Sequence, residues 1–381
     1  MRKTAGKIGW LCLLLAWHGF AREPAPTGHL SAADERIIAA LPKVLPGLNQ
    51  AYGLEVKRSQ AVLATYTFKV NAPNLVPDEW IVFVAKPVDL PSQKIGAASG
   101  KPKCEPVTDL SPLRQPLLRA RIPADDAAEE REMTLVVKTR AELFSRRLVA
   151  RHALPGPPKP AILSEQDRKL FLRRSRDFDY DGKGFQDWLT STGLKRPQSE
   201  GEVAFAKRVF QHLARTCHYE YLGRQDRSAS YVCASAKSDC GGMSVLFAAV
   251  MRSQGVPART LVGRWAKSAK PDDRVGEIGY FMEHVKAEFF ATSVGWVPVD
   301  VSAAVLHDKS AAKLEYFGTD RGDFLTLHFD SELAVDTLHF GVRPINLLQG
   351  GSFWVTGTGT LDDAVVRENW EVEALPGRGS R

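Results

Sequence analysis

The sequence is poor in cysteine, and its cysteines are not arranged as metal ligands are. Cys12 lies in the N-terminal segment, and the rest of the chain holds Cys104, Cys217, Cys233 and Cys240. No C-x-x-C or H-x-x-x-H pair accompanies them, so the sequence predicts no structural metal and no cofactor. Cys217 and Cys233 are near enough in the chain to close a short disulfide loop in an oxidising compartment, but two buried free thiols are an equally good interpretation.

Long apolar runs and clusters of basic residues are also missing from most of the chain. After the N-terminal segment, no stretch approaches the roughly 20 apolar residues that a transmembrane helix needs. The formal net charge is +7, and Arg2, Lys3 and Lys7 contribute to it. The other basic residues do not form the patch, interleaved with aromatics, of a nucleic-acid-binding protein. We therefore expect no nucleic acid partner and no stable membrane insertion once the N-terminal segment is removed.

The N-terminal segment has the pattern of a secretory signal peptide. Its three basic residues precede an apolar run from Ile8 to Trp17, and Gly19-Phe20-Ala21 supplies small residues at the positions before a cleavage site. This pattern predicts a signal peptide over residues 1–21 and a mature protein that is secreted or periplasmic. The alternative is an uncleaved membrane anchor, which the shortness of the apolar run disfavours.

The residues after the signal predict a tether with a short helix (22–60) and then a β domain (61–154). Apolar and polar residues alternate in several short stretches between prolines, which is typical of a small antiparallel sandwich. The expected strands include Tyr66–Val70, Trp80–Val84, Leu117–Ile122, Met133–Thr139 and Leu143–Arg151. The Pro-rich stretch at 155–160 is a stiff linker and marks the expected domain boundary.

Beyond this linker the pattern is helical first and strand-like later. Helical spacing of apolar residues precedes residue 255, and strands are expected from Arg259 onward. Helices that precede an antiparallel sheet indicate an α+β domain. We expect this domain over residues 161–350, further strands over 351–375 and a disordered tail over 376–381.

The stretch from Asp239 to Gly255 predicts a buried helix with a thiol at its start. Its residues are apolar around most of the helix circumference, which is typical of a core helix. Asp239 is the expected N-cap, Cys240 enters the first turn, and Gly255 stands at the C-terminal cap before Pro257. A thiol at a helix N-terminus meets the positive end of the helix dipole and free N–H groups, and both favour the nucleophilic thiolate.

Two later segments supply the partners that a thiolate nucleophile requires. Glu283 to Phe290 predicts a strand that carries the single histidine His284, and Gly295 to Asp300 predicts a strand that ends in a carboxylate. Their separation suits a hairpin that places base and carboxylate side by side. A Cys–His pair needs a third group to fix the ring tautomer and support its charge, and Asp300 can be that group.

These segments together resemble the transglutaminase-like superfamily, with its papain-like Cys-His-Asp core, in its secreted bacterial form. The resemblance rests on Asp239-Cys240-Gly241, Gly255-Val256-Pro257-Ala258-Arg259, Val262-Gly263-Arg264-Trp265, His284 with Ala287-Glu288, and Gly295-Trp296-Val297-Pro298-Val299-Asp300. It implies that Cys240 is the nucleophile, His284 the general base and acid, and Asp300 the residue that orients His284. It also implies the fold, a helical layer containing the nucleophile helix packed on an antiparallel sheet, behind a β-sandwich.

The chain departs from the family pattern two residues after the histidine. The family often has an aromatic residue there, which shields the active site in some members, whereas this chain has Lys286. The departure leaves the three expected catalytic residues in place but puts the substrate geometry in question. The backbone N–H of Cys240 is the expected first oxyanion donor, and a second is expected from Tyr231 to Ser238.

The resemblance implies acyl transfer from protein or peptide amides through a Cys240 thioester. Water would resolve the thioester in a protease or amidase, and an amine would resolve it in a transglutaminase that joins Gln and Lys side chains. The sequence leaves both directions open. The alternative is a non-catalytic interaction protein that retains the fold, although such a protein has no need of Cys240, His284 and Asp300 together.

Overall fold

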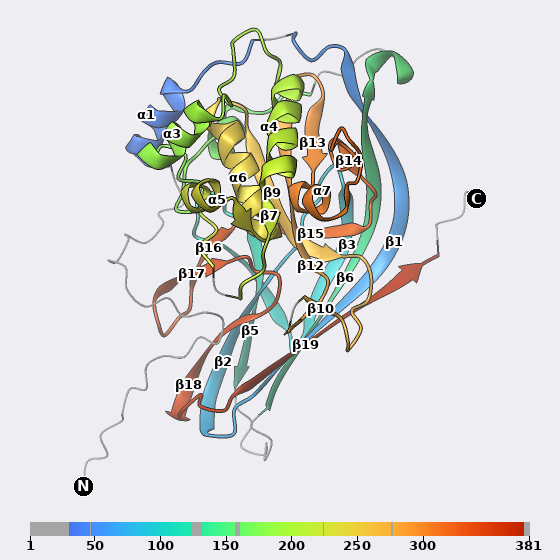
Figure 1. Cartoon of the computed structure of the whole chain (residues 1–381). Coiled ribbons are helices and arrows are strands. Elements are labelled where there is room, and N and C mark those ends of the chain that lie inside the picture. The colour runs from blue at the N-terminus through green and yellow to red at the C-terminus, as the bar shows by residue number, and fades with distance from the viewer. Residues whose placement is uncertain are drawn as a thin grey trace.

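The computed structural model describes residues 30–45, 47–123, 132–156, 161–223, 225–275 and 277–376. A layer of helices covers one side of a central sheet, and long curved strands form a β-sandwich on the other side (Figure 1). The predicted signal peptide (1–21), most of the Pro-rich linker and nearly all of the predicted tail lie outside the described residues.

Two antiparallel sheets make up the sandwich. The first has the order β14 (Thr319–Asp320), β6 (Glu132–Ala150), β1 (Tyr52–Asn71) and β19 (Val365–Leu375), with β3 (Gln93–Lys101) also paired to β6. The second has the order β18 (Ser352–Gly359), β2 (Leu75–Ala85), β5 (Pro116–Pro123) and β4 (Cys104–Thr108). Apolar side chains from both sheets share one core, so the sequence alternation that predicts half-buried strands is matched by packing.

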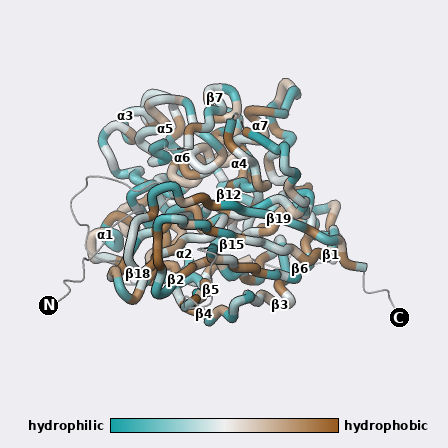
Figure 2. Tube along the Cα trace, turned by 90° about the horizontal axis from the view of Figure 1, so that it is seen from below, coloured by the Kyte–Doolittle hydropathy of each residue, from teal (hydrophilic) through white to brown (hydrophobic). Residues whose placement is uncertain are grey.

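The alternation is clear along β1, where every second side chain from Val62 to Val70 is buried and those between are partly exposed. Phe68 is fully buried against the second sheet, and burying a side chain of this size contributes about 2–3 kcal/mol. In Figure 2 the strand tubes change repeatedly between hydrophilic and hydrophobic colours, as expected of strands with one buried face.

The sandwich has one strand where the sequence predicts two, and it includes two strands from the C-terminal part of the chain. The strands expected at 133–139 and 143–151 form one continuous strand, β6, because it pairs along nearly the whole of the 20-residue strand β1. Strands β18 and β19, in the segment 351–375, pair with β2 and β1. Local alternation indicates a strand but carries no information about its partner, so this long-range pairing was not predictable from pattern alone.

The core sheet lies between the sandwich and the helices. Its antiparallel order is β13 (Gly295–Val299), β12 (Glu283–Ala291), β9 (Ala258–Trp265) and β15 (Phe324–Phe329). The helices beside it are α4 (Glu202–Thr216), α5 (Ala229–Ser235), α6 (Cys240–Ser253) and α7 (Val301–His307). The remaining elements are α1 (Ala32–Ala40), α2 (Glu165–Leu170), α3 (Lys183–Ser191), β7 (His218–Tyr219), β8 (Lys237–Ser238), β10 (Arg274–Val275), β11 (Ile278–Gly279), β16 (Glu332–Asp336), β17 (Val342–Asn346) and a 3-10 turn (Arg151–Ala153).

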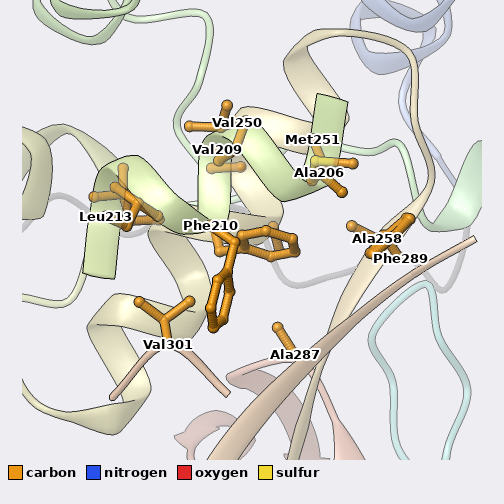
Figure 3. Packing of buried hydrophobic residues seen from close by; sticks show 14 of the residues in the cluster. Ala206, Val209, Phe210, Leu213, Val250, Met251, Ala258, Ala287, Phe289 and Val301 are labelled. Carbon is orange, nitrogen blue, oxygen red and sulfur yellow. The ribbon is translucent and has the colours of Figure 1, made fainter. Parts of the chain in front are cut away.

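Helix α6 is the buried helix that the sequence predicts. All of its residues after Cys240 are buried, and α4, β9, β12 and α7 surround it (Figure 3). The helix ends before Gly255, whose positive φ of 76° suits a glycine. A side chain there would also collide with the backbone of Pro42. Burial on every side fixes α6 along its axis and therefore fixes the place of its first residue, Cys240.

The helices of the described ranges are short. The longest is α4, with 15 residues, and none of them has both the length and the hydropathy to cross a membrane.

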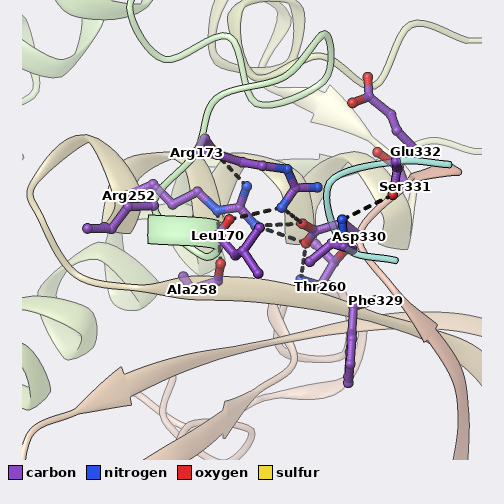
Figure 4. A network of polar contacts seen from close by, with 12 residues as sticks. Leu170, Arg173, Arg252, Ala258, Thr260, Phe329, Asp330, Ser331 and Glu332 are labelled. Carbon is purple, nitrogen blue, oxygen red and sulfur yellow. Dashed lines mark hydrogen bonds and ion pairs between the residues drawn. The ribbon is translucent and has the colours of Figure 1, made fainter. Parts of the chain in front are cut away.

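A buried cluster of charges fastens the C-terminal end of α6 to the core sheet (Figure 4). Arg252, on α6, donates two hydrogen bonds of 2.9 Å to the carboxylate of Asp330, which follows β15. Arg173 approaches the same carboxylate at 3.0 Å, and the backbone N–H of Thr260 donates to it. The Arg252 guanidinium also lies 3.8 Å from the centroid of the Phe178 ring. Because Asp330 serves two arginines, its removal would leave two buried cations without a full counterion.

We predict that Asp330→Asn lowers the free energy of unfolding by about 3–5 kcal/mol, because breaking a buried ion pair strands the remaining charge. Urea denaturation at pH 7 measures this change. Asp336→Asn is the matched control, because Asp336 is exposed and accepts a single backbone N–H. A loss below 1 kcal/mol for Asp330→Asn would contradict the structural role of the cluster.

Candidate active site

Cys240 stands at the N-terminal end of α6, where the sequence places it. Asp239 is the N-cap, and its Oδ1 accepts the N–H of Gly242 at 3.1 Å. The Arg227 guanidinium donates from Nε to both oxygens of Asp239, at 3.0 and 2.9 Å. A side chain on Gly241 would press against Arg227, so the glycine allows the guanidinium to lie beside the first turn. Cys240 is partly exposed, whereas the rest of α6 is buried.

His284 and Asp300 are in direct contact. His284 lies on β12, and its Nε2 is 2.7 Å from Oδ2 of Asp300. Asp300 follows β13 and is the N-cap of α7, with its other oxygen accepting the N–H of Ala303 at 3.0 Å and the hydroxyl of Ser302 at 3.1 Å. These bonds hold the carboxylate at a helix N-terminus, where negative charge is favoured. Because Asp300 occupies Nε2, Nδ1 is the ring nitrogen left to exchange a proton with a nucleophile.

The electrostatics of this pair favour an imidazolium. Burial lowers the pKa of His284, but the charge of Asp300 and its hydrogen bond with the ring, together with a hydrogen bond that the ring donates to the Cys240 sulfur, outweigh it and raise the pKa to about 10. Burial raises the pKa of Asp300, but the His284 charge and hydrogen bond dominate and lower it to about 2. At neutral pH the pair is therefore a cation beside an anion, with the ring in contact with the Cys240 sulfur.

The face of the His284 ring rests on aromatic side chains. The Trp265 ring is stacked on it, with 4.7 Å between centroids and an angle of 22°, and Phe324 meets it edge-on at 6.1 Å. Gly263 pairs with His284 across the sheet, and a side chain on Gly263 would collide with the Phe324 ring and the backbone of Leu325. The glycine therefore lets Phe324 approach the histidine and complete a support beneath the ring.

Tyr219 and Tyr280 are among the tyrosines that lie near enough to the Cys240 sulfur to be affected by its charge. Burial raises the pKa of Tyr219 and of Tyr280 above the ordinary value, and the charge of Cys240 raises both further. Both therefore keep the phenolic proton at neutral pH. Tyr280 also shares a side-chain hydrogen bond with Trp265, which ties this phenol to the support of His284.

The other cysteines of the described ranges are not paired. Cys104, Cys217 and Cys233 are all free thiols, so the disulfide alternative for Cys217 and Cys233 is not the state of this structure. Burial raises the pKa of Cys217 and of Cys233 to about 11, which makes both of them poor nucleophiles. Within the part of the chain that the structure describes, no three His, Cys, Asp or Glu side chains are grouped as metal ligands.

The structure thus brings the three sequence-predicted residues together, and it adds others that the sequence reasoning did not assign. Trp265 and Gly263 belong to the Val262–Trp265 segment that resembles the family. Their packing against His284, however, depends on the register between β9 and β12. Arg227 gave no sequence signal, because the loop that carries it has no periodicity. The expected second oxyanion donor from Tyr231 to Ser238 stays a prediction. Within this segment, the Ser238 hydroxyl oxygen is buried and has no hydrogen-bond partner among the described residues.

Comparison with known proteins bears on the core. Residues 190–301 match the model of the transglutaminase-like superfamily. That stretch is transglutaminase-like. The family resemblance and the α+β fold predicted from the sequence are confirmed, and at the level of the superfamily the match supports a thiol-dependent enzyme. No curated protein matches the sequence.

One solved structure supports the fold at low identity. A protein from Cytophaga hutchinsonii, provisionally assigned as a cysteine protease, has a TM-score of 0.51 at 11% identity, covering 86% of this chain and 94% of that one. The periplasmic domain of TgpA from Pseudomonas aeruginosa has a TM-score of 0.31 in its ethylmercury-bound form, at 14% identity and covering 74% and 99% of the two chains. The first likeness supports the fold, and the second score is too low to support more.

We predict that Asp300→Asn slows alkylation of Cys240 by iodoacetamide at pH 6–7 by about tenfold or more. Without the carboxylate, burial lowers the His284 pKa, and once this pKa lies below the working pH each further unit reduces the imidazolium fraction about tenfold. Stopped alkylation followed by mass spectrometry measures the rate.

The same variant has a stability signature of known sign. A raised His284 pKa stabilises the folded state fully below pH 6.5 and loses this contribution as pH rises toward 10, so wild type and variant should converge between these values. Asp308→Asn is the control, because the Asp308 carboxylate lies at the other end of α7 and accepts the backbone N–H groups of Ser310 and Glu315. If Asp308→Asn slowed alkylation of Cys240 as much as Asp300→Asn does, the role assigned to Asp300 would be wrong.

Proposed function

We propose that this protein is a thiol-dependent enzyme that transfers acyl groups from protein or peptide amides, with Cys240 as nucleophile, His284 as general acid and base, and Asp300 as the residue that orients His284. The observation that carries the proposal is the 2.7 Å contact of His284 with Asp300 while the same ring is hydrogen-bonded to Cys240. A lone buried histidine would have its pKa lowered by burial, whereas His284 is held protonated beside a thiol.

The proposed reaction begins with attack of the Cys240 sulfur on the amide carbonyl carbon. The carbonyl oxygen becomes an oxyanion, and the backbone N–H of Cys240, free at the start of α6, is placed to donate to it. His284 gives its Nδ1 proton to the leaving amine nitrogen as the C–N bond breaks, which leaves a thioester and a neutral ring. Asp300 keeps the ring in the correct orientation and supports its charge.

In the second half of the reaction the thioester is cleaved, and His284 acts as a base instead of an acid. His284 takes a proton from an incoming water or amine as that nucleophile attacks the thioester carbon, and the C–S bond breaks to restore the thiolate. Water yields a carboxylic acid, as in a protease or amidase, and a lysine amine yields a new amide, as in a transglutaminase. The transglutaminase-like superfamily acts on proteins, which supports Gln or Lys side chains or peptide amides as the substrate class.

We also propose a location and a domain division that agree with this activity. The signal pattern of residues 1–21 supports a secreted or periplasmic protein. We place the catalytic domain at 161–350 and the β domain at 61–154, with 351–375 as the strands that return to the β domain. Strand β1 extends the first sheet of the β domain back to Tyr52, into the stretch expected to be a tether.

The test compares wild type with Cys240→Ala on casein, scoring ammonia release, amine incorporation and new N-termini separately, beside labelling with a reactive-thiol probe. We expect the substitution to abolish labelling and to reduce product by a factor of roughly 10³ or more, because the step has no other nucleophile. Amine incorporation would identify a transglutaminase, and new N-termini a protease.

Cys104→Ala is the control, because Cys104 is a half-buried thiol on β4 and burial raises its pKa. This variant should keep full labelling and full activity. Product that persists in Cys240→Ala would overturn the proposal. Absence of both labelling and product in the wild type would instead favour a non-catalytic interaction protein that retains the fold.

A further inference from the structure

Lys286 occupies the position where the family often has an aromatic residue, and it is buried. It lies on β12 two residues from His284, so both side chains leave the same face of the sheet. Only 6% of Lys286 is exposed, which is rare for a lysine and costs free energy unless the charge is paired. Its side chain therefore lies behind the histidine and not in an open substrate cleft.

The ammonium of Lys286 is enclosed by two aromatic rings and one carboxylate. It lies 4.5 Å from the centroid of Trp265, 4.6 Å from that of Phe324 and 3.7 Å from Oδ1 of Asp320. A desolvated ammonium over aromatic faces is attracted to them by the negative charge density of the rings. These are the same two rings that pack on His284, so one cation contacts both parts of the histidine's support.

The counterion of Lys286 comes from the sandwich side of the interface. Asp320 is on β14, which pairs with β6, and its other oxygen is 3.2 Å from the Arg146 guanidinium. Arg146 also contacts Glu288, which in turn contacts Arg259. The charges that face Lys286 are therefore Asp320 and, more distantly, Asp300 and Arg146, with His284 and Glu288 on its own strand.

We propose that Lys286 is a positioning residue of this thiol site: it holds Trp265 and Phe324 against His284, and its positive charge acts on the His284–Asp300 pair. The effect of Lys286 on catalysis rests on the proposed function. Its effect on His284 rests only on the contacts described above. The charge favours the ionised Asp300, whose pKa Lys286 helps to lower. It opposes the like charge on the imidazolium, which keeps His284 able to release its proton to the leaving amine in the first half of the reaction.

The decisive test is an NMR titration of His284 in the Cys240→Ser background. Removing the thiolate removes a contribution that raises the His284 pKa, so the midpoint becomes easier to reach. In this background Lys286→Met keeps the apolar length and removes the charge. We expect the midpoint to rise by about half to one pH unit, because a buried like charge on the same face of the strand no longer opposes protonation.

A purely structural role would give a different result. If Lys286 only filled space, Lys286→Met would leave the midpoint unchanged, and if its loss detached His284 from Asp300, the midpoint would fall. Either outcome overturns the proposal. Lys286→Arg, which retains the charge, should keep the midpoint within about 0.3 unit of the parent. Lys207→Met is the control, because Lys207 is an exposed lysine on α4.

Kinetics on the otherwise wild-type chain give the second readout. We expect Lys286→Met to lower kcat/KM by about three- to tenfold at pH 7, mainly through kcat, because the support of His284 loosens without any change in substrate contacts. A wild type without activity would count against the proposed function and leave the titration result standing. Lys286→Gln replaces Lys286→Met if circular dichroism shows the methionine variant to be unfolded.

Discussion

Burying a charge away from water costs several kcal/mol unless an opposite charge meets it, and this constraint governs the interface between the core sheet and the sandwich. Along one face of β12, His284 meets Asp300, Lys286 meets Asp320, and Glu288 meets both Arg146 and Arg259. Each of these charges meets a charge of opposite sign, and those other than His284 are nearly inaccessible to solvent. Their partners come from β6, β9, β14 and the N-cap of α7, so every pair also fixes how two segments lie together.

The candidate active site depends on this arrangement as well as on its own residues. Helix α6 presents Cys240 because its other side chains are packed on all sides, and α7 presents Asp300 because the carboxylate caps the helix. His284 lies between them on a strand whose neighbouring charges are held by the sandwich. Each of the three groups is thus positioned by a separate physical cause: apolar burial, helix capping and charge pairing.

The sequence predicted those features that are encoded locally. Short stretches of sequence determine the apolar periodicity of α6, its N-cap at Asp239 and its end before Gly255. The same holds for the strand alternation around His284. Features that depend on tertiary register were not predictable. The stacking of Trp265 on His284 requires Gly263 to lie opposite the histidine, and the burial of Lys286 requires Asp320 to arrive on a two-residue strand far along the chain.

The sandwich itself shows the same limit. Alternation indicated several of its strands, but the merging of two expected strands into β6 was set by the length of β1, which no local signal in β6 reports. Arg227 is a similar case, because a lone arginine in a loop acquires meaning only when its guanidinium meets the Asp239 cap.

The return of the chain to the sandwich has a consequence for biosynthesis. Strands β18 and β19 supply an edge to each of the two sheets, so both sheets that begin forming with β1 and β2 stay incomplete until the end of the chain has emerged. The intervening core, with its helix-rich local contacts, can assemble earlier in synthesis than the domain that precedes it in sequence. Until then, β1 and β2 each present an open edge of the kind that pairs with other chains. A chain that is cut short before residue 352 lacks both strands, and the edges of β1 and β2 then stay unpaired and open to pairing with other chains.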